Sequence, residues 1–351
     1  MFQPVQTRRS TLHVILTMLE LIYHSIVRSV RKSHNNAFMA IATNILQAVI
    51  FVGAFYVMFS ILGLRGAALR GDFLIYIMSG IFLYMTHSKA LGAVVGSEGP
   101  ASAMMQHAPM NTIISICSAA LGALYIQVLS LAMILFAYHV AWTPLEIEQP
   151  AAAFAMLILA WFTGAALGLV LLAIKPWFPT AVGIFSTIYQ RANMIASGKM
   201  FVANTLPGFM LAMFDWNPLF HTIDQARGYA FLNYNPRYSD PMYAFWVGLV
   251  LVMIGWVMFR APTVGEALRI YAGMAGMNGW ALSATSLWQL QPTEMTALVL
   301  GGAIALSGQP LSRAAARTPA TLRIAANFTL MGVACLALLA QRNSPFLYFQ
   351  F

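Results

Sequence analysis

Long apolar runs recur along this chain and constrain its fold more than any other feature. A helix needs roughly 20 apolar residues to cross a bilayer, and six stretches of about that kind occur, at 37–63, 73–95, 112–140, 151–174, from 178 onward, and at 242–259. Charged residues make up only 8% of the chain, against roughly 25% in soluble domains. The sequence therefore predicts an all-α integral membrane protein with six transmembrane helices, followed by one or two further tail helices.

Residues 10–30 show apolar positions at helical spacing, interrupted by charged and histidine side chains. This pattern favours an amphipathic helix lying in the membrane interface over an ordinary surface helix. Lys175, Arg260 and the basic N-terminus would face the cytoplasm if the N-terminus lies inside, whereas Arg65 and Arg70 depart from this tendency. The net charge of +9 is explained by attraction to anionic lipid, so we expect no nucleic-acid partner.

Two segments are too polar or too broken to span. The stretch 96–109 is bounded by glycine and proline and predicts a short cytoplasmic helix. The stretch 197–239 contains six glycines and prolines between short apolar pieces, which favours half-helices that dip in from the outer face and are either buried in protein or line a cavity. Asp240 and Pro241 then form a helix-start signal for the last apolar run.

Over residues 8–259 this arrangement resembles permease subunits of type-2 ABC exporters, which move capsular polysaccharide or O-antigen lipopolysaccharide across the bacterial inner membrane. The outer segment carries the most specific part of the resemblance, in Ser197-Gly198, Leu206-Pro207, Asn217-Pro218-Leu219, His221 and Arg227. The resemblance implies a non-enzymatic, multi-pass transporter subunit of the inner (plasma) membrane with a cytoplasmic N-terminus. The implied partners are a separate ABC ATPase subunit, a second permease copy in a homodimer, a lipid-linked polysaccharide and membrane lipids.

The same resemblance assigns two groups of site residues. An ATPase-coupling helix would contain Glu98, Ala101, Met104, Met105, Gln106 and His107. An outer re-entrant segment along the transport path would contain Arg191, Gly198, Pro207, Trp216, Asn217, Pro218, His221 and Arg227. The chain itself is expected to bind no cofactor, with ATP-Mg on the partner subunit, since Gly198-Lys199 lacks the upstream glycine of a phosphate-binding loop.

A polysaccharide path needs aromatic faces and few fixed charges, because sugars stack on rings and strong charge binding stalls movement. The candidate aromatic residues are Tyr84, Tyr189, Phe201, Phe209 and Trp216, and the alternative for each is an interfacial or core position. Cations on the outer side are Arg191, Lys199 and Arg227. Arg191 either pairs with a sugar-linked phosphate or extends to the lipid headgroups, and Arg227 either acts in this path or pairs with Asp224 on one helix face.

Residues 257–351 resemble a different family, the C-terminal portion of membrane-bound O-acyltransferases of the alginate O-acetylation type. The resemblance rests on 259–268 and on 343–351. It divides the chain into an exporter-like domain, 1–260, and an acyltransferase-like tail, 261–351. The tail contains no histidine, and the family's acyl-transfer histidine lies upstream of this portion, so the catalytic part is missing. The alternative functions are an acyltransferase-related component of exopolysaccharide acetylation and a non-functional fusion.

Histidine and cysteine patterns indicate no metal site or disulfide framework. His87, His107 and His139 are scattered and are interpreted as interfacial or internally satisfied polar groups. Cys117 and Cys335 lie far apart inside apolar runs and are interpreted as small buried hydrophobic residues. Neither cysteine clusters with a histidine, so no metal is expected.

Overall fold

The computed structural model describes residues 20–27, 37–61, 72–97, 112–261 and 263–277. The chain divides into two compact units, Met1–Asn278 and Gly279–Phe351, and the second unit lies outside the described residues. All regular elements in the described part are helical: α2 (Ala37–Ile61), α3 (Phe73–Val95), α4 (Thr112–Ala141), α5 (Pro150–Ile174), α6 (Pro179–Ala196), η2 (Ala203–Thr205), α7 (Gly208–Phe214), α8 (Pro218–Ala230), α9 (Pro241–Arg260) and α10 (Val264–Met274).

Four helices in the described ranges are long and apolar enough to cross a membrane, which agrees with an all-α membrane protein. They are the Ile41–Ile61 part of α2, together with α4, α5 and α9. Helices α3 and α6 occupy the positions of the predicted second and fifth crossings but carry more polar side chains. Most residues of α3 are buried by neighbouring helices, so α3 does not need an apolar surface for lipid.

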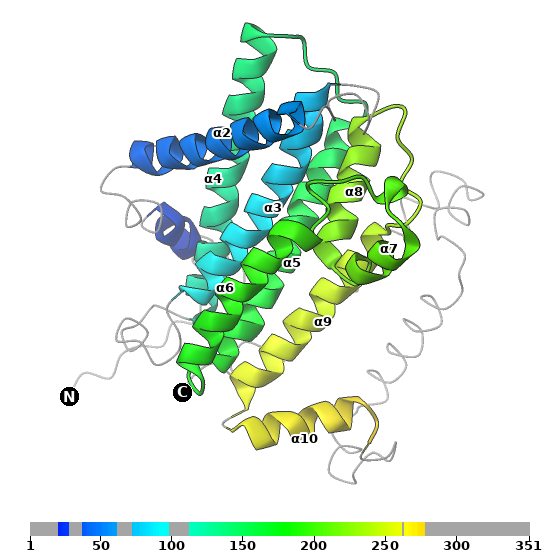
Figure 1. Ribbon diagram of the computed structural model, residues 1–351. Coiled ribbons are helices and arrows are strands. Elements are labelled where there is room, and N and C mark those ends of the chain that lie inside the picture. The colour runs from blue at the N-terminus through cyan, green and yellow to red at the C-terminus, as the bar shows by residue number, and fades with distance from the viewer. Residues whose placement is uncertain (1–19, 28–36, 62–71, 98–111, 262, 278–351) are drawn as a thin grey trace, which may run out of the picture. The chain divides into compact units, whose positions relative to one another are not determined.

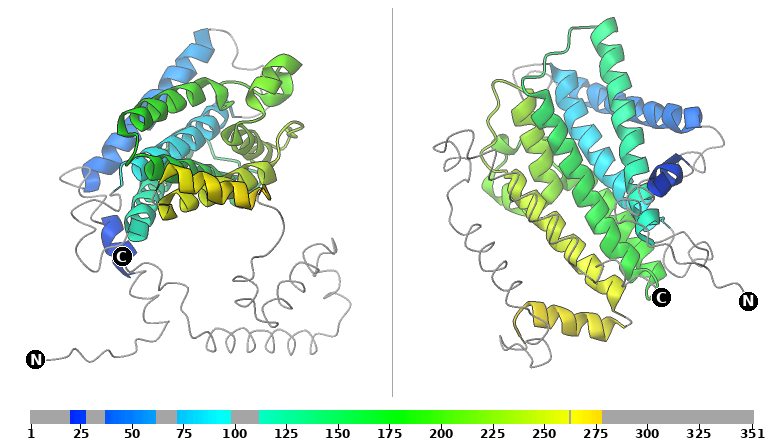
Figure 2. Two further views of the ribbon diagram at one scale, coloured as in Figure 1. Left: turned by 90° about the horizontal axis from the view of Figure 1, so that it is seen from below. Right: turned by 180° about the vertical axis from the view of Figure 1, so that it is seen from behind.

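Helix α3 lies at the centre of the bundle, with α5 packed along it and α9 on the other side of α5 (Figure 1). Helix α2 lies across α3 and α4, as Figure 1 and the right-hand view of Figure 2 show. Gly164 and Gly168 of α5 face α3, where an added Cβ would lie 2.9 Å from the Cα of His87 and from the Cβ of Val94, respectively. Small residues four positions apart are the usual means of close helix packing in membranes.

Local signals in the sequence set several helix starts. The side chains of Asp72, Asn217 and Asp240 accept hydrogen bonds from backbone N–H groups in the first turns of α3, α8 and α9. Proline follows at the first position of α8 and α9, where its missing N–H is not needed. The predicted start of the last apolar helix at Asp240-Pro241 is confirmed.

The segment 197–239 forms the short 3-10 helix η2 and two α-helices. Helix α7 has seven residues, and α8 has 13 residues that are nearly all buried against α3, α5 and α9. The breakers predicted the interruptions between these helices, but they did not predict that α8 forms part of the core. Leu219, Phe220 and Ile223 of α8 are each at most 1% exposed.

Helix α10 packs against the end of α9. Ala267 lies in a buried cluster with Met258 and Ala261, and the Tyr271 hydroxyl donates a hydrogen bond to the carbonyl of Ile254 at 2.6 Å. The predicted domain boundary after residue 260 stays a prediction. Of the predicted interfacial helix, only 20–27 is described, and it is helical.

Candidate functional site

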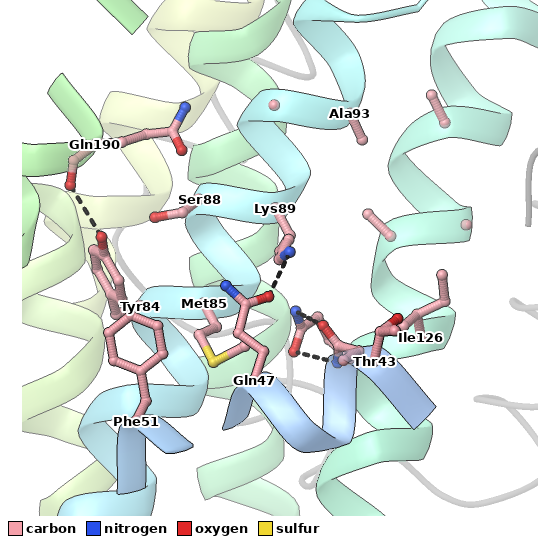
Figure 3. Close-up of a pocket in the computed structure, with 16 residues that line it drawn as sticks. Thr43, Gln47, Phe51, Tyr84, Met85, Ser88, Lys89, Ala93, Ile126 and Gln190 are labelled. Atoms are coloured by element: carbon pink, nitrogen blue, oxygen red, sulfur yellow. Dashed lines mark hydrogen bonds between the residues drawn. The ribbon is translucent and has the colours of Figure 1, made fainter. Parts of the chain in front are cut away.

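A polar groove of about 630 Å³ opens between α2, α3 and α4, with Gln190 of α6 at its edge (Figure 3). We refer to it as the α2–α4 groove. Its hydrogen-bonding side chains are Thr43, Asn44, Gln47, Tyr84, Ser88, Lys89, Gln127 and Gln190. Among the described residues, no carboxylate lines it. Polar groups are expensive in membrane helices, so their concentration in one groove marks a candidate binding site.

Amide side chains in the groove are oriented by hydrogen bonds between helices. Lys89 donates to the Gln47 side-chain oxygen at 2.9 Å, which joins α3 to α2. Asn44 donates to the Ser130 hydroxyl at 2.8 Å, and Gln127 donates to the Asn44 side-chain oxygen at 3.3 Å, which joins α2 to α4. Amides and hydroxyls both donate and accept, so these groups suit a ligand with many hydroxyls.

Tyr84 and Phe51 form an aromatic wall of the groove. The Tyr84 hydroxyl donates to the Gln190 carbonyl at 3.1 Å. Behind the wall, the Lys199 ammonium lies 3.7 Å from the centre of the Tyr84 ring and 5.1 and 5.5 Å from the Phe55 and Phe51 rings. Burial lowers the pKa of Lys199 to about 8, and cation–π attraction to the rings opposes that shift.

Arg227 fastens the loop 198–201 to α8. Its guanidinium donates to the carbonyls of Gly198, Lys199 and Phe201 at 2.6 to 2.9 Å and lies 4.2 Å from the Tyr76 ring centre. Arg227 is only 1% exposed, so its charge is held by carbonyl dipoles and a ring face. This arrangement is structural, since it closes a loop onto the core.

The proposed pairing of Asp224 with Arg227 is wrong. Asp224 accepts hydrogen bonds from the hydroxyls of Tyr234 and Ser239 instead. Burial, together with the Asp224 carboxylate, raises the pKa of Tyr234. Tertiary contacts override the helix spacing because loops before and after α8 offer each side chain a buried partner.

Two histidines in the described part have both ring nitrogens occupied. His87 donates from Nδ1 to the Ala160 carbonyl at 3.1 Å, and its Nε2 accepts from the Tyr189 hydroxyl at 3.1 Å. His221 donates from Nε2 to the Asp215 carbonyl, and its Nδ1 accepts from the Asp240 N–H at 2.9 Å. His87 and His221 therefore hold helices and loops together rather than face a substrate.

The predicted path residues do not form one surface. Gly198, Asn217, Pro218, His221 and Arg227 are buried, whereas Arg191, Pro207 and Trp216 are exposed. Among the aromatic candidates, Tyr84 lines the groove, Tyr189 bonds His87, Phe201 stacks on Phe214, and Phe209 and Trp216 are exposed. The predicted coupling residues, which fall within 98–107, lie outside the described residues.

Sequence reasoning did not identify Asn44, Gln47, Lys89 and Gln127 as members of one site. Each is a polar residue in a long apolar helix, and this was the available signal. Within the described ranges, no group of three or more His, Cys, Asp or Glu side chains is placed to hold a metal ion. Cys117 is a free, partly buried thiol. The expectation that the chain binds no cofactor stays a prediction.

Comparison with known proteins gives a partial match. No family model matches the chain. A protein named "probable alginate O-acetylase AlgI" from Pseudomonas putida is 31% identical over 157 residues, covering 39% of this chain and 31% of that protein. The Azotobacter vinelandii protein of that name is 31% identical over 141 residues, covering 30% and 28%. The Pseudomonas aeruginosa protein is 33% identical over 85 residues, covering 24% and 16%. The chain thus spans about a third of the length of the first relative.

These matches support the acyltransferase-like tail and overturn the exporter reading. An acetylase is an enzyme, so the expected non-enzymatic permease of capsule or O-antigen export, with its ATPase partner and second permease copy, is wrong. The exporter reading rested on the order of apolar runs and breakers and on a few short residue patterns in the outer segment. Any multi-pass membrane protein must satisfy the same bilayer constraints, so that order does not specify a reaction.

Proposed function

We propose that this chain is a membrane-embedded component of exopolysaccharide O-acetylation, related to the alginate O-acetylases. The observation that carries the proposal is the identity of 31–34% to four proteins of that name. The acceptor is a polysaccharide hydroxyl, and the transferred group is acetyl. The membrane position of the helices suits a reaction that passes an acetyl group to a polymer at the membrane.

The α2–α4 groove is the part of the described bundle that suits the acceptor. Gln47 presents an exposed amide that can donate to and accept from sugar hydroxyls, while the buried Asn44 and Gln127 bond each other in the groove lining. The Tyr84 ring offers a flat face on which the apolar side of a sugar can stack. The groove volume of about 630 Å³ lies within the usual range for small-molecule sites, roughly 300–1,000 Å³.

Acetyl transfer to a hydroxyl forms an ester bond between the sugar oxygen and the acetyl carbonyl carbon while the donor's bond to that carbon breaks. The hydroxyl proton goes to a base. His87 and His221 have both ring nitrogens occupied, so we assign neither of them to proton transfer and assign the α2–α4 groove to acceptor binding.

We also propose that α3 and α6 complete six crossings with α2, α4, α5 and α9, in the bacterial inner membrane with a cytoplasmic N-terminus. Lys175 after α5 and Arg260 at the end of α9 support this orientation. The α4–α5 connection carries Glu146 and Glu148 and no basic residue, as expected of an outer loop.

The test is the acetyl content of the exopolysaccharide made by the bacterium that carries this chain. Deleting the chain should remove most ester-linked acetyl, measured by nuclear magnetic resonance before and after mild alkali, without abolishing the polymer. The full chain should restore it, and Gln47→Leu should restore it by less than half. Thr187→Val changes an exposed polar residue of α6 that does not line the groove and should restore it fully.

Unchanged acetyl content in the deletion strain would overturn the proposed function. Full restoration by Gln47→Leu would agree with the proposed function but would show that acetylation does not depend on the groove. Polymer yield is measured in parallel, because a loss of polymer with an unchanged acetyl-to-sugar ratio would mean that the chain does not act in acetylation.

A further inference from the structure

The walls of the bundle have an unbalanced charge. Helices α2 to α6 contain no Asp or Glu, but they contain Lys89 and Arg191. The loop after α6 adds Lys199. An ionisable group in a membrane helix is costly and indicates function by default. Two of these cations, Lys89 and Lys199, lie in or directly behind the α2–α4 groove.

Lys89 is positioned to contact a ligand. It lines the groove and is exposed, and its ammonium donates to Gln47 at 2.9 Å (Figure 3). An ammonium has three N–H donors, and no second hydrogen bond of Lys89 occurs within the described part of the chain. Two N–H donors of the positively charged Lys89 ammonium are thus available to a ligand that enters the groove.

Lys199 adds charge that nothing in the described residues neutralises. Lys199 is 3% exposed, and its ammonium has no hydrogen-bond partner among the residues that the structure describes. The rings that surround it include Tyr84 and Phe51, which are also the aromatic wall of the groove. A buried charge is screened much less than a surface charge, so its field reaches the groove through this wall.

We propose that the α2–α4 groove binds an oxyanion, a carboxylate or phosphate group, with Lys89 as its direct ligand and Lys199 as a second positive charge behind Tyr84. No carboxylate of the described residues lines the groove, so none of them competes with a ligand for Lys89. The neutral amides around Lys89 then bind the rest of the ligand. This inference concerns ligand charge and does not rest on the proposed acetyl transfer.

The experiment measures binding to the purified full-length chain in non-ionic detergent by microscale thermophoresis. The probes are an oligosaccharide of four uronic acid residues, its carboxyl-reduced neutral counterpart, and inorganic phosphate as a competitor. A charge-assisted hydrogen bond predicts that the acidic oligosaccharide binds at least about tenfold more tightly than the neutral one. Raising the salt concentration should reduce that preference.

Variants test which residues cause the preference for the acidic oligosaccharide. Lys89→Gln should abolish it with little effect on the neutral oligosaccharide, and Lys89→Arg should keep it. Lys175→Gln is the matched control, because Lys175 donates to the Val95 carbonyl and does not line the groove. Lys199→Met should weaken acidic binding alone. Size-exclusion profiles check folding, and Lys89 is exposed, so its variants are expected to fold.

Equal affinity for the acidic and neutral oligosaccharides would overturn the inference, and so would a preference that survives Lys89→Gln. Displacement of the acidic oligosaccharide by phosphate would support a site for oxyanions in general. A Lys89-dependent preference without displacement would support a carboxylate presented on a sugar. A normal acetyl content in the deletion strain would overturn the proposed function and leave these binding results unaffected.

Discussion

Arg227 illustrates how a single buried residue organises this molecule. It is 1% exposed and is stabilised by three backbone carbonyls of the loop 198–201 and by the face of Tyr76. A planar guanidinium can reach several acceptors at once and stack on a ring, whereas a lysine ammonium is a compact point charge. The role of Arg227 thus depends on its shape as well as its charge.

We predict that Arg227→Lys lowers the free energy of unfolding by about 2–3 kcal/mol, because buried carbonyls lose their donor. Thermal unfolding of the purified protein in detergent measures the change. Arg237→Lys is the control because Arg237 is exposed. This variant should unfold at the same temperature as the unchanged protein. Equal melting temperatures for the two variants would show that the Arg227 hydrogen bonds do not stabilise the fold.

At the scale of elements, the pairing of α3 with α5 determines where the core lies. Gly164 sits against the backbone of His87, and Gly168 sits against the Leu91 carbonyl and Val94. The Gly164 position leaves no room for a methyl group, and close approach of the two helices also lets His87 reach the Ala160 carbonyl. Packing of α3 against α5 therefore positions a polar side chain as well as the apolar core.

Gly164→Ala should destabilise the protein by about 1–3 kcal/mol, because overpacking forces the two backbones apart. Gly92→Ala is a matched control in α3, where an added Cβ meets nothing within 4 Å, and its better helix propensity should leave stability unchanged or slightly raised. Both variants are compared by thermal unfolding in detergent. If Gly164→Ala is tolerated as well as Gly92→Ala, the helices can separate without cost.

At the scale of the whole molecule, the proposed six crossings put the α4–α5 connection and the α5–α6 connection on opposite sides of the membrane. In a variant without its native cysteines, Glu146→Cys should react with a membrane-impermeant maleimide in spheroplasts, and Phe178→Cys should react only after the membrane is opened. Glu146 and Phe178 are both exposed on the surface of the described bundle. Labelling of both sites from one side would contradict the topology.

Local patterns predicted the bounds of the long apolar helices closely. The runs expected at 73–95, 112–140 and 151–174 correspond to α3, α4 and α5, whose ends are Phe73–Val95, Thr112–Ala141 and Pro150–Ile174. Apolar length, proline and capping side chains act within a few residues of each other, so the sequence contains them directly. The function was not predicted correctly, because the order of apolar runs suggested an exporter and the matches to acetylases overturned that interpretation.

By itself, the sequence determined the membrane class, the bounds of the long apolar helices and the acyltransferase-like character of the tail, because each depends on neighbouring residues or on a match in sequence. Tertiary structure alone decided which polar residues meet. Asn44 bonds Gln127 across 83 positions, and Asp224 bonds Tyr234 instead of Arg227. Helix spacing defines a face but not the partner that packs against it, so the groove and its unbalanced charge emerge only when α2, α3 and α4 come together.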